Sequence, residues 1–572
     1  MANSKDNVGR NCVKLLYACL IAITVAFSCK RAGKQESKAI ASIEIYREMR
    51  QEKLNRPRPV IHNNDGCDAY LYPLKVSSEF ASQPRPGGAA GPQVDYEFSL
   101  SNFLKLRSAG LKGTDVSTIS YCSITSSFGQ FTHNTKVGEF LTLTHQRPGR
   151  RNVVPEFVKL GTDPLEVTGK YARENGFEFF WSNRVNDTHD SGHRPDNPYE
   201  RWSKLKAAHP EYLFGSPGEK LPHGRWSSVD FNRPEIRDLC VQYYTEVCEN
   251  YDVDGIELDF FRHLYLFKEV ARGAVATAEQ LTMLTDMLTQ IREMTERVGM
   301  KKGKPILVLV RIPDSIDYGR GVGIDIETWM EKGLVDMIVG SDYFRLNFWD
   351  YLVAMGHRYG VKVYAGLSEP RVQNEHPALV RLQNPVYRAR ASAAWQAGVD
   401  GLYIFNEYNT RSRYLKEIGN AGKLEHKNNL YFVTYRNGNP NSYLKNGRDY
   451  SAIPILTPVN PRVLESAPVS FQLEIGNENT PARTALILYL KEGAPEWIKA
   501  SLNNTDLNYL KKTNDGLAVF EVPAGSVKPG INTLNIGLKQ GNPATLLDAA
   551  LFFYRDADDP DMKELTAICF GN

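Results

Sequence analysis

The sequence predicts an α/β protein: a (β/α)8 TIM barrel followed by a C-terminal β-sandwich domain. Eight strand-like runs alternate with helix-like segments between about residue 60 and residue 410. After about residue 425 the helical periodicity fades, and short β runs with Gly, Pro and Asn between them dominate. The ends of the eight runs are rich in ionisable residues, as expected where barrel loops build an active site.

The eight predicted barrel strands are 60–63, 116–121, 177–182, 255–260, 306–311, 337–342, 361–367 and 401–406. The predicted crossover helices are 163–175, the segment from 232 onward, 277–297, 325–332, 350–359 and 386–397. Asp163 and Pro164 are typical of a helix start, because Asp caps the first turn and Pro needs no N–H partner there. An open doubly wound sheet is the alternative fold, but no Gly-x-Gly-x-x-Gly follows the first strand.

Residues 183–229 form a long polar loop, rich in Pro and Gly, after the third predicted strand. Loops of this length in a compact domain are usually functional or disordered. We expect this one to form a wall of the substrate cleft. Beyond the barrel, the predicted sandwich strands are 430–433, 469–473, 484–490, 516–522, 530–537 and 549–554.

The chain of 572 residues divides into four predicted parts. Residues 1–29 are a lipoprotein signal peptide, residues 30–59 a tether with one surface helix, residues 60–424 the catalytic barrel, and residues 425–572 an accessory β-sandwich. The leader has three basic residues before an apolar run over 15–27 that is short for a membrane span. The run ends in Val-Ala-Phe-Ser-Cys, which resembles a bacterial lipobox with Cys29 as the lipidated residue, although the strict pattern prefers Leu at Ala26.

We therefore expect a lipoprotein of the bacterial cell envelope, held to a membrane by its lipid and facing the periplasm or the surface. An ordinary cleaved signal or a short anchor is the alternative.

The formal net charge of +3 argues against nucleic acid as the main partner, since nucleic-acid binding requires a basic stripe. Five cysteines remain after the leader, an odd number that predicts no disulfide framework, although Cys67 and Cys122 lie near the ends of neighbouring strands and are a possible pair.

No metal or cofactor is predicted. The first strand carries His62-Asn63-Asn64 in place of His-x-His, and no Cys-x-x-Cys occurs. The Gly-x-Ser-x-Gly elbow and the phosphate-binding Gly-x-x-x-x-Gly-Lys-Ser/Thr motif are also absent.

The fourth predicted strand carries two carboxylates on one face. Ile256, Leu258 and Phe260 alternate with Glu257 and Asp259, and successive side chains of a strand point to opposite faces. A central strand of an ordinary parallel sheet is apolar on both faces. The pattern therefore predicts a barrel strand that opens into an active site.

Polar residues also follow the ends of the predicted strands. Arg262 and His263 follow the fourth strand, and Asn63, Arg311, Asp342, Glu369, Asn406 and Glu407 lie at the ends of other strands. Two carboxylates around a cleft are typical of the active site of a glycoside hydrolase, in which one is the acid and the other is the nucleophile or the base. We predict Asp259 as nucleophile or electrostatic stabiliser and Glu369 as acid/base, with Asp342 as the next catalytic residue.

The predicted substrate-binding residues are Glu257, Arg262, His263, Arg311, Glu407, Asn406 and Asn63, with Trp181, Trp226 and Tyr343 for sugar stacking. The predicted function is thus a lipid-anchored glycoside hydrolase acting on a poly- or oligosaccharide. One alternative is a non-catalytic glycan-binding lipoprotein on a barrel scaffold. Another is a polysaccharide lyase with Tyr343 or His263 as its base.

Residues 226–237, with the sequence Trp-Ser-Ser-Val-Asp-Phe-Asn-Arg-Pro-Glu-Ile-Arg, are followed by Val-Asp-Gly-Ile-Glu-Leu-Asp-Phe at 253–260. This passage resembles bacterial glycosyl-hydrolase-like proteins of the family 10-like group. The resemblance covers about residues 60 to 410 and implies a carbohydrate-active TIM barrel with Asp259 in its active site. The strand ends in Glu-Leu-Asp-Phe-Phe-Arg here, where many members of the group have Asp-Asp-Tyr.

Overall fold

The computed structural model describes residues 39–77, 93–95, 97–142, 146–147, 149–341, 343–478, 482–556 and 559–571. The predicted signal peptide with Cys29, and the predicted catalytic residue Asp342, lie outside the described residues. Among the helices that are described, none combines the length and the apolar character needed to cross a membrane.

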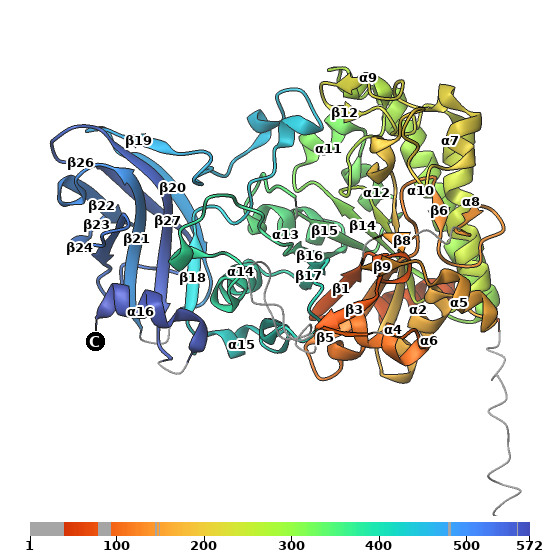
Figure 1. The fold of residues 1–572 in the computed structure, drawn as a ribbon, viewed down its shortest axis with the longest axis horizontal. Helices are drawn as coiled ribbons and strands as arrows, with labels where there is room; N and C mark the ends of the chain where they lie inside the picture. Colours follow the sequence, from red (N-terminus) through yellow and green to blue (C-terminus); the bar gives the residue numbers. More distant parts are fainter. Residues whose placement is uncertain are drawn as a thin grey trace, which may run out of the picture.

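Eight parallel strands close into a barrel, in the order β1-β17-β16-β15-β14-β13-β10-β5 (Figure 1). Their bounds are β1 (Val60–Asn64), β5 (Val116–Cys122), β10 (Glu178–Arg184), β13 (Gly255–Asp259), β14 (Leu307–Ile312), β15 (Met337–Gly340), β16 (Lys362–Gly366) and β17 (Gly401–Phe405). The first strand pairs with both the second and the last, which closes the ring. All eight predicted strands are confirmed, and the open sheet is excluded.

Helices surround the barrel as crossovers. They are α4 (Leu100–Arg107), α5 (Val154–Lys159), α6 (Pro164–Glu174), α8 (Pro234–Asn250), α10 (Ala278–Lys302), α11 (Ile316–Val322), α12 (Ile326–Glu331), α13 (Trp349–Arg358) and α14 (Asn384–Gln396). The predicted start of α6 is confirmed, since the Asp163 side chain accepts a hydrogen bond from the Glu166 N–H. Helix α10 begins with a reciprocal capping box between Thr277 and Gln280.

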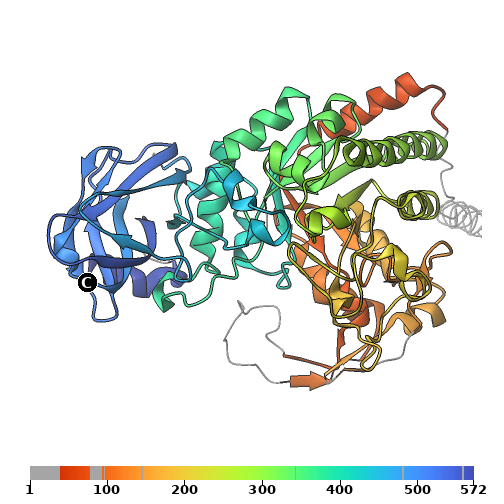
Figure 2. The same ribbon diagram turned by 90° about the horizontal axis from the view of Figure 1, so that it is seen from above.

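The predicted surface helix before the barrel is α2 (Ile43–Leu54), which lies beside α10 (Figure 2). Its last turn reaches the amino-terminal ends of the barrel strands. There Lys53 Nζ donates to the carbonyl oxygens of Asp254 and Pro305, each at 2.9 Å. This helix therefore closes the face of the barrel opposite the predicted active site.

The long segment after β10 is folded. It contains η2 (His189–Gly192), α7 (Lys204–Ala208), η3 (Pro210–Tyr212) and the hairpin of β11 (Lys220–Leu221) and β12 (Gly224–Arg225). Asn186 connects the two ends of this segment, because its side chain donates to the Val229 carbonyl at 2.8 Å and accepts from the Val229 N–H at 3.1 Å.

The smaller elements of the barrel region are α3 (Cys67–Tyr70), β2 (Tyr72–Pro73), β3 (Lys75–Ser77), β4 (Gln93–Asp95), η1 (Ala109–Leu111), β6 (Gln130–Phe131), β7 (Glu139–Phe140), β8 (Gln146–Arg147), β9 (Arg150–Arg151), α9 (Lys268–Ala271), η4 (Pro377–Leu379) and η5 (Arg413–Lys416).

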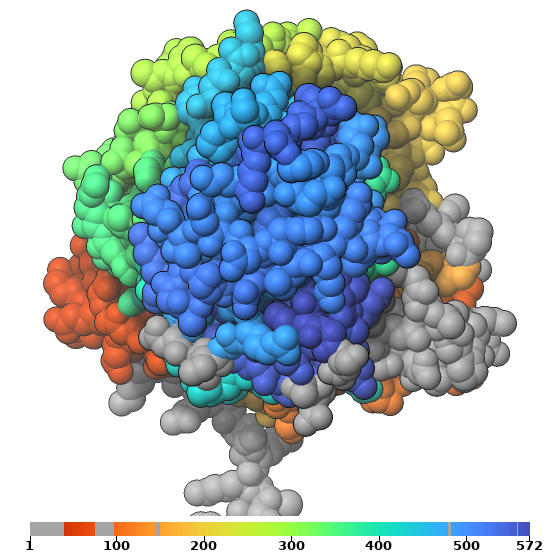
Figure 3. Space-filling view, turned by 90° about the vertical axis from the view of Figure 1, so that its left-hand side faces the viewer, coloured from red at the N-terminus to blue at the C-terminus, as the bar shows by residue number. Residues whose placement is uncertain are grey.

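Two antiparallel sheets form the C-terminal sandwich, which makes up one end of the molecule (Figure 3). One sheet contains β18 (Asn429–Phe432), β27 (Ala544–Tyr554), β21 (Arg483–Glu492), β25 (Leu517–Glu521) and β24 (Asn508–Lys512), with β19 (Arg462–Leu464) paired to β27. The other contains β20 (Val469–Ile475), β26 (Gly530–Leu538), β22 (Ile498–Leu502) and β23 (Thr505–Asp506). The six predicted sandwich strands are confirmed, and β19, β22, β23 and β24 are additional.

The remaining elements are α15 (Ala421–Leu424), η6 (Pro440–Ser442), η7 (Gly447–Tyr450), η8 (Pro495–Trp497), η9 (Pro560–Met562) and α16 (Lys563–Phe570).

Buried ion pairs join the sandwich to the barrel. Arg381 lies 2.9 Å from Asp548 of β27, and Arg388 of α14 pairs with Asp559. Because breaking a buried pair leaves an uncompensated charge, these contacts hold the sandwich firmly against the barrel.

The possible pairing of Cys67 with Cys122 is wrong. Both thiols are free, and so are the three other cysteines that the structure describes. Burial raises the pKa of the Cys122 thiol to about 12, so this side chain is a small apolar group in the core.

Candidate active site

The strand register brings three charged side chains to one level at the carboxyl end of the barrel. Arg184 of β10 is paired with Asp259 of β13, and Asp259 is paired with Arg311 of β14. Since paired residues of neighbouring strands point to the same face, all three are directed toward the barrel axis. We call this end the barrel mouth.

Asp259 and Arg311 form an ion pair that is closed to solvent. The Arg311 Nε atom donates to Asp259 at 2.7 Å, and both side chains are 0% exposed. The same carboxylate oxygen accepts the backbone N–H of Arg262 at 2.9 Å. Asp259 therefore does not reach the surface, and its observed role is to hold Arg311 and the start of the loop after β13.

Two aromatic rings cover this ion pair. The Arg311 guanidinium carbon lies 4.0 Å from the centre of the Phe405 ring and 5.4 Å from that of Tyr343. Arg262 donates to the Tyr343 hydroxyl, and its guanidinium carbon lies 5.5 Å from the ring centre. Guanidinium groups stacked on aromatic faces gain cation–π energy, so the floor of the mouth is a packed array of arginines and aromatic rings.

Glu257 lies one layer below and is fully buried. Its carboxyl group accepts hydrogen bonds from Ser120, from Tyr403 at 2.7 Å and from Asn63 at 3.3 Å. Burial raises its pKa, and the nearby charge of Asp259 raises it further. Asn63 and Glu257 are thus brought together in the barrel interior, below any substrate.

Asp187, which sequence reasoning missed, is the most heavily coordinated carboxylate of the mouth. It is fully buried and accepts from Arg184 at 3.2 Å, from Arg262 at 3.3 Å and from the His189 ring at 2.5 Å. Burial alone would raise its pKa, but His189 and Arg262 hold that pKa well below its ordinary range. Its position three residues after the end of β10 was the available signal.

His189 bridges Asp187 and Arg262. Its Nδ1 atom faces Asp187, and its Nε2 atom lies 2.8 Å from Arg262. An arginine has only donors, so Nε2 is the acceptor in this contact. His263 lies behind this group, where its Nδ1 atom accepts the Thr188 N–H at 3.0 Å. Burial holds the pKa of His263 well below its ordinary value, which favours the neutral ring.

Among the described carboxylates of the mouth, Glu369 and Glu407 are partly exposed, and they follow the consecutive strands β16 and β17. Glu369 follows β16, its side chain is 40% exposed, and it lies 3.3 Å from Arg371. Glu407 follows β17 and is partly buried; it accepts from the Tyr414 hydroxyl and from the Asn409 N–H at 2.6 Å. Burial raises the pKa of Glu407, and the negative charge of Glu369 raises it further. The charge of Glu369 therefore acts on the pKa of Glu407.

The backbone turns sharply between β17 and Glu407. Asn406 has a φ of +54°, in the left-handed region that Asn tolerates better than most residues. Its N–H still donates to the Asn63 carbonyl at 3.2 Å, and His62 Nε2 lies 3.1 Å from the Glu407 carbonyl. This turn directs Glu407 into the mouth.

We predict that Asn406→Val destabilises the protein by about 1–2 kcal/mol, because a β-branched residue is strained at this φ. Asn406→Gly should cost less than half as much, since Gly adopts this conformation freely. Urea unfolding of the two variants measures the difference. Equal losses would show that the Asn406 side chain, and not the backbone conformation, accounts for the stability.

The three predicted sugar-stacking residues do not present free ring faces. Trp181 is fully buried in the core and donates its N–H to Ser123 at 2.8 Å. Trp226 is 3% exposed and packs against Trp202, with 5.3 Å between ring centres. The predictions for both tryptophans are wrong, because their large rings fill space inside the fold. Tyr343 does lie at the mouth, but arginines cover its ring, so its prediction as a stacking platform is also wrong.

Among the described residues, no group of three or more His, Cys, Asp or Glu side chains is arranged to hold a metal ion. Three acidic groups of the mouth, Asp187, Asp259 and Glu369, are instead paired with arginines. Asp65 shows the same pattern, since it pairs with Arg107 and accepts from the Tyr408 hydroxyl at 2.9 Å.

No protein-family model matches the chain, and no curated protein matches it. Among solved structures it is similar to α-L-fucosidase isoenzyme 2 from Paenibacillus thiaminolyticus, with 16% identity and a TM-score of 0.36 over 65% of this chain and 50% of that one. It is also similar to the GH36 α-galactosidase AgaA from Geobacillus stearothermophilus, with 11% identity and a TM-score of 0.34 over 84% of this chain and 56% of that one. The glycoside hydrolase domain of PgaB (BpsB) from Bordetella bronchiseptica gives 9% identity and a TM-score of 0.38 over 64% of this chain and 99% of that domain. The chain spans about half the length of the fucosidase and the galactosidase.

Proposed function

We propose that the protein is a glycoside hydrolase that cleaves a poly- or oligosaccharide at the barrel mouth. The observation that carries this proposal is the pair of accessible carboxylates, Glu369 and Glu407, at the ends of consecutive strands. Their environments differ, since Glu407 is partly buried with a raised pKa and Glu369 is more exposed. Acid-assisted glycoside cleavage uses two carboxyl groups in separate roles, and a raised pKa suits Glu407 to the role of the acid.

In the proposed mechanism Glu407 is the general acid. Its raised pKa keeps the carboxyl proton available at a pH where an ordinary glutamate has lost it. It donates this proton to the glycosidic oxygen as the bond to the anomeric carbon breaks. Glu369 then stabilises the cationic sugar, either as a nucleophile or by activating a water molecule. This proposal differs from the sequence-based one, in which Glu369 was the acid/base and Asp259 the nucleophile or electrostatic stabiliser.

Asp259 has a supporting role in this proposal. Because it is fully buried against Arg311, it fixes the arginine and aromatic floor on which the sugar would lie. Arg262 is the part of this floor nearest to solvent, with its side chain 12% exposed. It therefore offers donors to sugar hydroxyl groups.

A screen of the purified protein on polysaccharides and aryl glycosides tests the proposal. We expect hydrolysis of at least one substrate, and loss of that activity in both Glu407→Gln and Glu369→Gln. Binding without cleavage would favour the glycan-binding alternative. Products with an unsaturated uronic acid would favour a lyase instead.

The pH dependence of kcat/KM tests the assignment of the acid. Activity should fall as the pH rises through the pKa of Glu407, which lies above the ordinary value of 4.5, because the acid works only when protonated. Glu369→Gln removes a negative charge that raises this pKa, so the basic limb of any residual activity should move to lower pH. A basic limb that stays in place would show that another group is the acid.

We also propose that the enzyme is a lipoprotein anchored through Cys29 to a membrane of the bacterial cell envelope. The basic, apolar and small-residue sequence of the leader supports this proposal. Cells fed labelled palmitate should label the wild-type protein, whereas the Cys29→Ser variant should remain unlabelled. Label in the variant would overturn the assignment of Cys29.

A further inference from the structure

The sandwich sheet that contains β21 and β27 is apolar on both of its faces. In β21, Leu486 and Leu488 belong to the main apolar core, whereas Ala485 and Ile487 point the other way, into a second apolar cluster. A strand of an ordinary sandwich carries polar residues on its outer face. The outer face of this sheet is therefore covered by another element.

The element that covers this face comes from the barrel. It is η4, in the segment 367–383 that connects β16 to α14. We call this segment the Glu369 loop, after the proposed catalytic carboxylate near its start. Ala378 and Leu379 of η4 are buried in the same apolar cluster as Ala485 and Ile487, and η4 also contacts α16. Apolar side chains therefore pack the Glu369 loop onto the sandwich.

A buried histidine adds a polar contact between the loop and the sandwich. The Nε2 atom of His376 lies 2.5 Å from Asp515, which is in the turn between β24 and β25. The Nδ1 atom of the same ring accepts the Ala378 N–H at 3.1 Å, so Nε2 is the donor to Asp515. The ring also packs edge-on against Tyr489 of β21, with 5.1 Å between ring centres. His376 is thus fixed on the sandwich from two sides.

A buried ion pair holds the end of the loop. Arg381 is fully buried, lies 2.8 Å from Glu375 of the same loop and 2.9 Å from Asp548 of β27, and donates to the Thr434 carbonyl at 2.7 Å. Its guanidinium carbon lies 4.0 Å from the centre of the Phe432 ring. The contacts to Asp548, Thr434 and Phe432 all cross from the loop to the C-terminal part of the chain.

The part of the loop next to Glu369 is held at both of its ends. At its start, the Ser368 carbonyl accepts from Arg390 of α14 at 2.9 Å. Between Glu369 and the anchored η4, Arg371 and Asn374 have φ values of +50° and +59°. Left-handed conformations of residues other than Gly persist where the surrounding structure fixes them. The sandwich, which anchors η4, therefore helps to set the path of the chain on which Glu369 lies.

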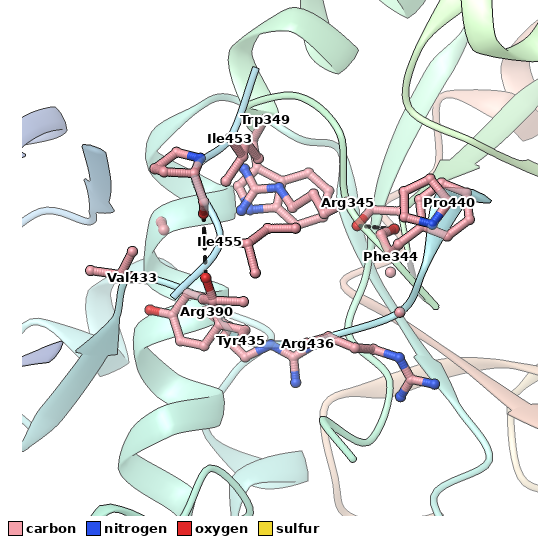
Figure 4. Close-up of a pocket in the computed structure, with 16 residues that line it drawn as sticks. Phe344, Arg345, Trp349, Arg390, Val433, Tyr435, Arg436, Pro440, Ile453 and Ile455 are labelled. Carbon is pink, nitrogen blue, oxygen red and sulfur yellow. Dashed lines mark hydrogen bonds between the residues drawn. The ribbon is translucent and has the colours of Figure 1, made fainter. Parts of the chain in front are cut away.

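The sandwich also contacts the preceding loop of the mouth, which connects β15 to α13 and carries Tyr343. Glu474 of β20 accepts from the Arg345 side chain and from the Trp349 N–H at 2.7 Å. The Arg345 guanidinium carbon lies 4.1 Å from the centre of the Trp349 ring, and Figure 4 shows the two side chains together. Two consecutive loops of the mouth are thus attached to the sandwich.

We propose that the sandwich positions Glu369 for the reaction, with Leu379, His376 and Asp515 as positioning residues. This inference rests on the proposed function, because it takes Glu369 to be the nucleophile or the base of a glycoside hydrolase. It makes the C-terminal sandwich a working part of the active site.

Hydrogen exchange followed by mass spectrometry tests the anchor without any substrate. Asp515→Ala removes the acceptor of His376, so a peptide covering residues 376–383 should exchange about fivefold faster. Asp515→Asn keeps an oxygen that accepts from His376 and should exchange like wild type. Asp506→Ala is the matched control, since it removes an exposed aspartate that lies 3.9 Å from Lys499 on the other sheet. Unchanged exchange in folded Asp515→Ala would overturn the proposal, whether or not the protein cleaves a glycan.

Steady-state kinetics test the positioning of Glu369. Asp515→Ala and Leu379→Ala should each lower kcat about tenfold, because a small misplacement of a reacting group is costly. KM should stay within about twofold, since the arginine and aromatic floor is untouched. Asp515→Asn should restore kcat, and so should Leu379→Met, which conserves volume. Thermal unfolding confirms that each variant is folded at the assay temperature.

The pH profile separates positioning from general loosening of the fold. A displaced Glu369 raises the pKa of Glu407 less, so the basic limb of kcat/KM in Asp515→Ala should move to lower pH, as in Glu369→Gln. Arg107, Tyr387 and Tyr414 also interact with Glu407, and none of them lies on the Glu369 loop. Faster exchange with unchanged kcat and an unchanged basic limb would overturn the positioning role. Absence of a substrate for the wild-type protein would instead count against the hydrolase assignment, and the exchange result would still decide the anchor.

Discussion

Replacing Glu407 by Gln should lower kcat by about 10²–10⁴-fold on a substrate with a sugar leaving group. The amide oxygen can still accept the Asn409 N–H, and the amide NH2 can donate to the Tyr414 hydroxyl oxygen where the second carboxylate oxygen accepted from it. The local structure is therefore preserved while the acidic proton is lost. Steady-state kinetics on the best substrate from the screen measure the effect.

The leaving group provides the decisive control for this prediction. A dinitrophenyl glycoside needs little protonation to depart, so Glu407→Gln should lose far less activity on it than on a natural glycan. Glu331→Gln, which changes an exposed carboxylate on α12, should remain within twofold of wild type on both substrates. An equal loss on both substrates would contradict the role of Glu407 as the acid and favour a role as nucleophile or base.

Replacing Asp259 by Asn should destabilise the protein by about 3–5 kcal/mol, because it leaves Arg311 charged and buried without its partner. The loss should appear as a lower midpoint in urea unfolding. A second change, Arg311→Met, should restore part of the stability of Asp259→Asn, since an apolar side chain of similar length has no charge to compensate.

Kinetics on the same variants show whether Asp259 only holds the arginines and aromatic rings of the mouth in place or itself takes part in the reaction. If Asp259 acts through the floor of the mouth, the double variant should recover activity together with stability. A folded double variant that remains several powers of ten below wild type would contradict this view. It would restore the sequence-based prediction that Asp259 itself takes part in the reaction.

Contacts among the described residues join the sandwich to the barrel. Arg381 joins Glu375 of the barrel region to Asp548 of β27 at 2.8 and 2.9 Å. Arg436, in the segment that follows β18, donates to the carbonyl of Tyr343 in the barrel mouth at 3.1 Å. The C-terminal part of the chain therefore contacts the candidate site, although the sequence indicated only an accessory β-sandwich.

The architecture followed from the sequence because strand and helix patterns are local. Alternating Ile256, Glu257, Leu258 and Asp259 predicted a barrel strand with polar groups directed inward, and the closed barrel confirms it. Placement at strand ends likewise indicated that Arg311, Glu369 and Glu407 belong to one face. Side chains at the carboxyl ends of the barrel strands lie at the same end of the barrel, where the loops build the active site.

The roles of these residues depended on contacts between distant segments. Asp259 could not be recognised as a buried partner of Arg311 from spacing alone, nor could Trp181 and Trp226 be recognised as core residues. Asp187 was overlooked because two of its partners, Arg262 and His263, lie 75 and 76 positions further along the chain. The sequence by itself determined the barrel, the sandwich and the set of charged strand ends, since each depends on neighbours in the chain. Only the tertiary structure decided which carboxylates are buried and which reach solvent, because burial and charge pairing are set by what the fold packs around each group.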